Sequence, residues 1–245
     1  MTAGNQTRSR LAEWTKVTQA VLRYIPAFAH LKSWLDRHGG EEAPVISCLY
    51  DDVLDVLKAV LTGVPVDEEW YRREYPAVAK AISHWGENPG RQHFPKHGYF
   101  EGLSPFYEKW RDLPVPPPFE AVAARLSITP KHGRLFASFR RDYLLDLISV
   151  ILRSVPVEAD WYFQTYPDAK AAVEAGEYQS ASDHYSRSGY FLSYLHKSVT
   201  VDSEGYLNRY KQARNSINLG SSISAQDHFD RIGYLEGCRP VGPWP

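Results

Sequence analysis

The pattern of apolar and polar positions along the chain is typical of amphipathic helices. Two apolar stretches, residues 52–61 and 143–152, each have the length of about three helical turns. A further amphipathic helix is predicted in residues 1–40, through Leu11, Trp14, Val17, Val21 and Ile25. Pro26 is expected to bend this helix, and Gly39-Gly40 to stop it.

The chain carries one aromatic-rich module three times. Residues 51–105 align with residues 142–196 at a constant offset of 91 residues and without a gap, and residues 201–240 form a shorter third copy. In every copy an acid stands 26 residues before a histidine: Asp67 and His93, Glu158 and His184, Asp202 and His228. Chance does not keep such a spacing three times, so we treat the copies as structural repeats.

Each repeat begins with signals for the start of a helix. The leading acid suits a helix N-terminus, although Glu is a weaker side-chain cap than Asp. The valine before the acid and the tyrosine four residues after it have the spacing of a hydrophobic staple. Pro76 and Pro167 fit the first turn of a second helix. Lys211 takes the place of this proline in the third copy, so we expect the break between the two helices to be lost there.

The closing helix of each repeat has its own start and stop signals. Capping boxes are predicted at residues 180–183 and 224–227, whereas the first copy offers Asn88 as the cap and Pro89 in the first turn. A left-handed glycine with positive φ is expected at the end of each closing helix: Gly98, Gly189 and Gly233. A Glu-Gly turn follows in the first and third copies. The second copy has Leu192-Ser193 instead, and we expect its exit to take another path.

These signals predict a mainly α fold, with helical repeat modules in two related halves and a small β-hairpin near residues 125–139. The predicted segments are an N-terminal amphipathic helix (1–40), a first helical module (41–105), a Pro-rich linker with the hairpin (106–141), a second helical module (142–196), and a third, shorter module and tail (197–245). The prolines of residues 113–118 favour a stiff, extended linker.

Charge and hydropathy limit which binding partners and which cellular location are expected for the protein. With 28 Lys and Arg against 29 Asp and Glu, the net charge of -1 gives no field that would draw nucleic acid, so no nucleic-acid partner is expected. No apolar run is long enough for a transmembrane segment, and the polar N-terminus lacks a signal peptide. A cytoplasmic location is the default, with association to a surface or particle as the alternative. The chain has two cysteines, Cys48 and Cys238, so whether they pair in a single disulfide stays an open question.

No catalytic residue, metal ligand or cofactor is predicted. The chain has no GxGxxG, GxxxxGK[ST], HExxH or GxSxG motif and no Asp-x-Asp pair. One histidine per module gives equivalent positions in separate helix sets, which favours a structural role for His93, His184 and His228 over a metal site. His93 and His97 could share a helix face, but two ligands make a weak site. The acids at residues 67–69 suit a first helical turn better than acid-base catalysis.

The recurrent aromatic residues have two interpretations. Equivalent positions in stacked modules usually form a shared core. The same flat, apolar surfaces with a polar rim also suit sugar rings or a protein groove. The candidate ligand-binding residues are Trp70, Tyr75, Trp161, Tyr166, Tyr99, Tyr190 and Tyr234. We expect a ligand surface on those left exposed after stacking, above all the first four. The third copy has Gly205 in place of the tryptophan and is expected to bind less well.

The pattern [DE]xxWYxxxYP[DA] followed by SAxxH[YF]xxxGYxEGxxP resembles a short module of bacterial proteins linked to surface-polysaccharide loci and glycosyltransferases. The resemblance covers about half of the chain. It implies a non-enzymatic protein that binds or scaffolds surface polysaccharide, with a glycan as ligand. Two alternatives stay open. One is a structural or attachment subunit of a larger complex, with a protein partner or a homo-oligomer held by the N-terminal helix. The other is an enzyme of unrecognised type in polysaccharide metabolism.

Overall fold

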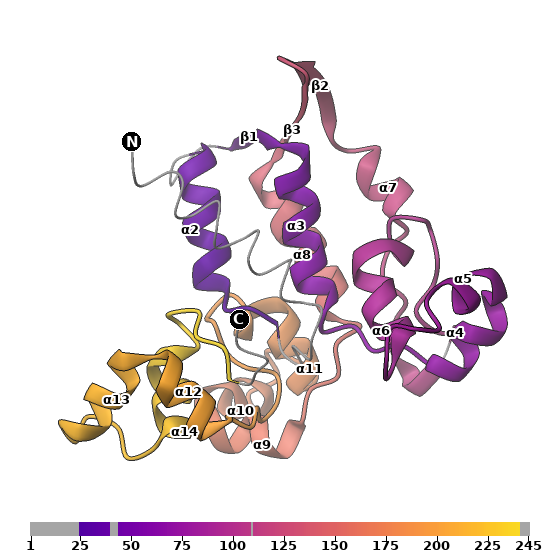
Figure 1. Cartoon of the computed structure of the whole chain (residues 1–245). Helices are drawn as coiled ribbons and strands as arrows, with labels where there is room; N and C mark the ends of the chain where they lie inside the picture. Colours follow the sequence, from indigo (N-terminus) through magenta and orange to yellow (C-terminus); the bar gives the residue numbers. More distant parts are fainter. Residues whose placement is uncertain (1–24, 40–43, 109, 241–245) are drawn as a thin grey trace.

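The computed structural model describes residues 25–39, 44–108 and 110–240 (Figure 1). Most of the predicted N-terminal helix, with Leu11, Trp14, Val17 and Val21, lies outside these residues. Ile25 and Pro26 are not helical. They precede helix α2, Phe28–Gly39, which runs up to the glycine pair predicted as its stop.

Three short strands form an antiparallel sheet in the order β1-β3-β2: β1 is Val45–Leu49, β2 is Ser127–Lys131 and β3 is Arg134–Arg140. His132 and Gly133 join β2 to β3 with positive φ at both positions, as a tight hairpin turn requires. The predicted hairpin is therefore confirmed, within a mainly α fold, and its tip extends from the top of the molecule in Figure 1.

Strands β1 and β3 pair at positions that the repeat makes equivalent. Ser47 lies opposite Ser138, 91 residues further along the chain, and the Ser138 hydroxyl donates a hydrogen bond to the Ser47 hydroxyl at 3.1 Å. Because equivalent residues face each other across an antiparallel pair, an approximate two-fold axis passes between the two serines. The duplicated unit thus begins at the strand, a few residues before the repeat that the sequence reveals.

Helices α3, Tyr50–Leu61, and α8, Arg141–Leu152, follow these strands and pack against each other near the centre of the molecule (Figure 1). They contain the two apolar stretches found in the sequence. Each helix buries one face, and the buried residues occupy equivalent positions: Val53, Val56, Leu57, Val60 and Leu61 in α3; Leu144, Leu147, Ile148, Ile151 and Leu152 in α8. The two halves therefore share one central core.

Each repeat continues as two short helices and a third that widens into a π-helical turn. In the first copy these are α4 (Glu68–Glu74), α5 (Pro76–Ala81), α6 (Pro89–His93) and the turn Phe94–Gly98. In the second they are α9 (Ala159–Thr165), α10 (Pro167–Glu174), α11 (Ala181–His184) and Tyr185–Gly189. In the third they are α12 (Ser203–Arg209), α13 (Lys211–Asn218), α14 (Ala225–His228) and Phe229–Gly233. Between the first two copies lie the 3₁₀ turn Trp110–Asp112 and α7 (Phe119–Ala123).

The helix-start signals hold where the capping residue is short. Asp67 and Asp202 accept hydrogen bonds from backbone N–H groups three residues on, at 3.1 and 3.2 Å, whereas Glu158 makes no such bond. Ser180 and Ser224 cap their helices in the same way, at 3.1 Å each. A short side chain reaches back to its own helix and a longer one does not, which agrees with the predicted ranking.

Two expectations about helix boundaries are wrong. Asn88 is left-handed, with φ of 53°, and its side chain does not cap α6. The Glu68 carboxylate instead accepts from the N–H groups of Gly90 and Arg91, at 3.0 and 2.7 Å. Pro89 does take the first turn. The break before Lys211 persists without a proline, because the preceding residue, Tyr210, is tied through its hydroxyl to a distant backbone N–H.

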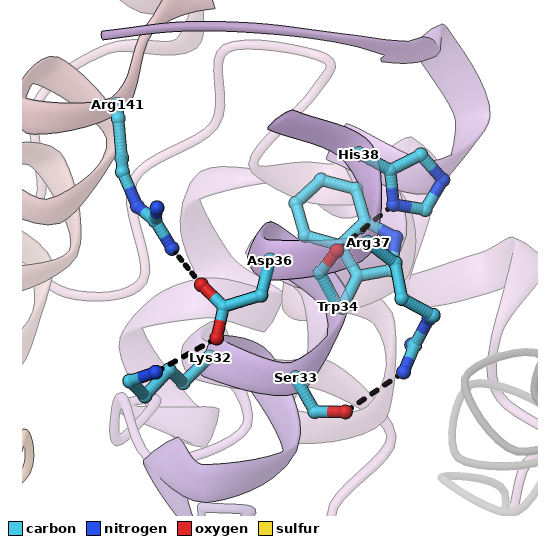
Figure 2. A network of polar contacts seen from close by, with 7 residues as sticks. All are labelled: Lys32, Ser33, Trp34, Asp36, Arg37, His38 and Arg141. Atoms are coloured by element: carbon cyan, nitrogen blue, oxygen red, sulfur yellow. Dashed lines mark hydrogen bonds and ion pairs between the residues drawn. The ribbon is translucent and has the colours of Figure 1, made fainter. Parts of the chain in front are cut away.

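Helix α2 is joined to the second half of the chain by a carboxylate. Asp36 accepts a hydrogen bond from Lys32 at 2.7 Å and forms an ion pair with Arg141 at the start of α8 (Figure 2). The hydrogen bonds from Lys32 and then Arg141 hold the pKa of Asp36 below its usual value. This link fixes α2 beside the central helices.

The third repeat has a core of its own, to which Ala27 and Leu195 also contribute. The Tyr234 hydroxyl donates to the carbonyl of Ile25 at 3.0 Å, so the third repeat contacts the chain just before α2. Cys48 lies in the central core and Cys238 in the third repeat, and these two described residues form no disulfide. Within the described part of the chain, no helix is long and apolar enough to cross a membrane.

Candidate ligand-binding groove

A buried tyrosine-histidine pair stands at the centre of every repeat. A hydrogen bond of 2.9 Å joins the tyrosine hydroxyl to Nδ1 of the histidine in all three pairs: Tyr71 with His93, Tyr162 with His184, and Tyr206 with His228. Burial lowers the pKa of each histidine. Among the described residues, no three His, Cys, Asp or Glu side chains are placed to hold a metal ion. Each histidine is thus a buried hydrogen-bond partner of the tyrosine in its own repeat.

The recurrent glycines have a different cause from the one predicted. Gly98, Gly189 and Gly233 end π-helical turns, and none of them has positive φ. A Cβ atom at each would lie well under 3.0 Å from the hydroxyl oxygen of the tyrosine in the pair. The expectation of left-handed caps is thus wrong. Glycine is needed because the tyrosine hydroxyl approaches its backbone closely.

Positive φ occurs instead at the exit of each repeat, at Gly102, Ser193 and Gly237. In all three copies the next residue donates its N–H to the carbonyl of the glycine that ends the π-helical turn, at 2.7 to 2.8 Å. The second copy therefore leaves by the same path, contrary to expectation, and Ser193 adopts φ of 63° to do so.

The second tyrosine of each repeat holds the segment with which the chain leaves the repeat. The hydroxyls of Tyr75, Tyr166 and Tyr210 accept hydrogen bonds from the backbone N–H groups of Ser104, Leu195 and Arg239, each at 2.9 Å. All three rings are partly buried. These tyrosines thus have a structural task at the hydroxyl, while part of each side chain stays accessible.

In the first repeat, Trp70 and Tyr75 line an open groove of about 930 Å³. Their rings meet edge to face, with centroids 5.7 Å apart. The other lining residues come from the end of the repeat and the chain that follows it: Ser104, Phe106, Tyr107, Glu108, Asp112, Leu113, Pro114 and Val115. Tyr107 is 48 % exposed. The groove thus joins flat apolar surface to a few polar groups, as small-ligand sites do.

One side of this groove is shaped by an unusual turn. Arg111 and Asp112 are successive non-glycine residues with φ of 51° and 53°, a region that costs free energy for side-chain-bearing residues. The Arg111 guanidinium lies over the ring of Trp110, 4.5 Å from the centroid, and Trp110 stacks on Phe106. Asp112 lines the groove and Arg111 does not.

The equivalent surface of the second repeat is covered. Tyr194 stacks on Tyr166 with centroids 3.9 Å apart and planes within 3°, and its hydroxyl donates to Asp168 at 2.6 Å. Trp161 packs against both the central core and the core of the third repeat. Burial raises the pKa of Tyr166 to about 12, and the Asp230 carboxylate of the third repeat adds to the rise. The two predicted aromatic faces are therefore not equivalent.

The remaining candidates offer no ligand face. Tyr99, Tyr190 and Tyr234 are buried, which agrees with the interpretation of these recurrent residues as core. In the third repeat Gly205 leaves no tryptophan beside Tyr210. Of the predicted residues, the structure thus brings Trp70 and Tyr75 together at an open surface.

Several residues of the groove escaped prediction from the sequence. Phe106, Tyr107, Glu108 and Asp112 follow the first repeat and have no counterparts in its pattern, so the search for repeated positions passed over them. A signal was present in the aromatic residues beside the Pro-rich linker, which we interpreted as a spacer. No family model matches the chain, and neither a curated protein nor a solved structure matches it.

Proposed function

We propose that this chain is a non-enzymatic protein that binds a polysaccharide, and that the groove at Trp70 and Tyr75 is its binding site. The observation that carries the proposal is the open aromatic groove beside the first repeat. Tryptophan and tyrosine present flat apolar faces to the apolar faces of sugar rings, while hydroxyl and carboxylate groups at the rim bond to sugar hydroxyls. The resemblance of the repeat to modules of polysaccharide loci supports the same ligand class, a bacterial surface polysaccharide.

A glycan-array screen of the purified chain, followed by calorimetric titration of the best ligand, tests this proposal. Trp70→Ala and Tyr107→Ala each remove groove surface, and we expect each to weaken binding at least tenfold, equivalent to about 1.4 kcal/mol. Trp85→Ala is the matched control, because Trp85 belongs to the same repeat and does not line the groove. Melting curves verify that each variant is folded.

The proposal fails if no glycan binds, or if Trp70→Ala and Tyr107→Ala bind as tightly as the unchanged chain. Equal loss in Trp85→Ala would also contradict it, because the effect would then come from the repeat as a whole and not from the groove.

A further inference from the structure

We propose that the groove selects a glycan whose sugars carry free, protonated amino groups, and this inference rests on the proposed glycan-binding function. The groove has two charged residues among its described lining, Glu108 and Asp112, and both are acidic. Neither forms an ion pair with another described residue. A ligand in the groove therefore meets negative charge and aromatic surface together.

The local turn separates the two signs of charge. Arg111 lies between Trp110 and Asp112 in sequence, yet its guanidinium is placed over the Trp110 ring. At these two successive left-handed positions, Asp112 is a lining residue of the groove and Arg111 is not, while the Arg111 guanidinium lies over the indole of Trp110. An acidic glycan would meet two carboxylates there without this cation as a partner.

Coulomb energies indicate the size of the selectivity. A pair of unit charges about 4 Å apart in water changes a binding constant roughly fivefold, and salt screens part of this. For two carboxylates we expect an amine-bearing oligomer to bind about tenfold tighter than its N-acetylated counterpart. A uronic-acid oligomer of the same length is repelled and should bind more weakly than either.

The test titrates the full chain with three oligosaccharides of equal length: chitosan, its fully N-acetylated form chitin, and oligogalacturonate. The measurement is made at mildly acidic pH, where the chitosan amines carry protons. We expect chitosan to bind tightest, with a preference that shrinks as salt is raised. The double variant Glu108→Gln, Asp112→Asn should lower chitosan affinity about tenfold, so that chitosan and chitin bind alike. Trp70→Ala should weaken both.

The possible failures are distinguishable. If chitin or oligogalacturonate binds as tightly as chitosan and this binding is lost in Trp70→Ala, the groove binds glycan but the amine selectivity is wrong. If no oligosaccharide binding depends on Trp70, the proposed function and the selectivity both fail. A lysine-rich peptide of the same charge is the last comparison: equal affinity with the same dependence on Glu108 and Asp112 would show a site for basic peptide and overturn the proposal.

Discussion

The first and second repeats have the same interior and different surroundings. In both, a tyrosine bonds to a histidine beside a glycine, and a second tyrosine holds the exit. Around the first, the chain leaves through Phe106 and Tyr107 and a groove stays open. Around the second, Tyr194 covers Tyr166, and the third repeat packs against Trp161.

This difference between the two repeats shows that two kinds of contact act on the same sequence pattern: those inside the repeat and those with the surrounding chain. The hydrogen bonds inside the repeat fix its shape, so the positions that make them recur in all three copies. The tryptophan lies at the edge of this framework, where its surroundings depend on the next segment of the chain. A recurrent residue can therefore pack between two cores in one copy and line an open groove in another.

The largest expected difference concerns the two tryptophans. Trp161→Ala should lower the free energy of unfolding by about 3 kcal/mol, because the partly buried indole packs against two cores. Trp70→Ala should cost about 1 kcal/mol, since one side of that indole faces the groove. Urea unfolding of both variants measures this. Equal losses would break the comparison.

The second repeat should also give the protein a stability that depends on pH. Its last residue, His196, stands where the other copies have Pro105 and Pro240. Burial lowers the pKa of His196 from 6.5 to about 4, although its Nδ1 atom lies 2.9 Å from the Pro156 carbonyl. Below its unfolded pKa the unfolded chain binds the proton more readily, so stability falls as the pH drops from about 6.5 to about 4, by roughly 2 to 3 kcal/mol.

Urea unfolding at a series of pH values measures this loss, and His196→Gln is the control. Glutamine keeps a polar group near the Pro156 carbonyl but does not titrate, so the slope between these pH values should decrease. The paired histidines have lowered pKa values too and will leave a residual slope in the same direction. An unchanged slope in His196→Gln would contradict the assignment.

Because the two repeats share the same interior, equivalent substitutions there should lower stability equally, and by less than Trp161→Ala does. Gly98→Ala and Gly189→Ala should each destabilise by about 1 to 3 kcal/mol, because the new methyl group collides with a tyrosine hydroxyl. Removing that hydroxyl makes room, so Tyr71→Phe should recover part of the loss in Gly98→Ala, and Tyr162→Phe in Gly189→Ala. Double-mutant cycles detect this coupling. Additive losses would show that the collision is not the cause.

The sequence predicts the framework well because its signals are local. Apolar periodicity identified the regions of α3 and α8, short capping residues marked helix starts, and the His-Gly turn marked the hairpin. These features depend on residues a few positions apart. The pairing of Ser47 with Ser138 could have been expected from the offset of 91, but a strand of five residues gives a weak pattern by itself.

The errors come from contacts between distant positions. A glycine after a helix usually indicates a left-handed cap, and the tyrosine hydroxyl that excludes a side chain from Gly98 comes from α4. The cap of α6 is supplied by Glu68, more than twenty residues earlier. For the candidate site, repetition identified Trp70 and Tyr75 but gave no way to tell them from Trp161 and Tyr166, because the residues around each pair, such as Leu103 in one copy and Tyr194 in the other, differ between the copies.

The smallest effects are expected when the residues that distinguish the first repeat's surface from the second's are exchanged. Leu103 and Tyr194 are equivalent in the repeat, and Tyr194 occupies one face of the Tyr166 ring. Tyr194→Leu should uncover this face at a cost of about 1 kcal/mol in stability, the usual value of an aromatic pair. We expect a second, weak glycan site in calorimetric titration.

The reverse exchange, Leu103→Tyr, should place a tyrosine beside Tyr75 and weaken binding in the first groove severalfold, while the fold is retained. Asp168→Ala is the control for the second repeat, because it removes the acceptor of the Tyr194 hydroxyl and leaves the ring in place. It should therefore open the surface less than Tyr194→Leu does. If Tyr194→Leu still binds a single glycan and Leu103→Tyr binds as tightly as the unchanged chain, the stacked tyrosine does not decide which repeat binds, and the third repeat against Trp161 must account for the difference.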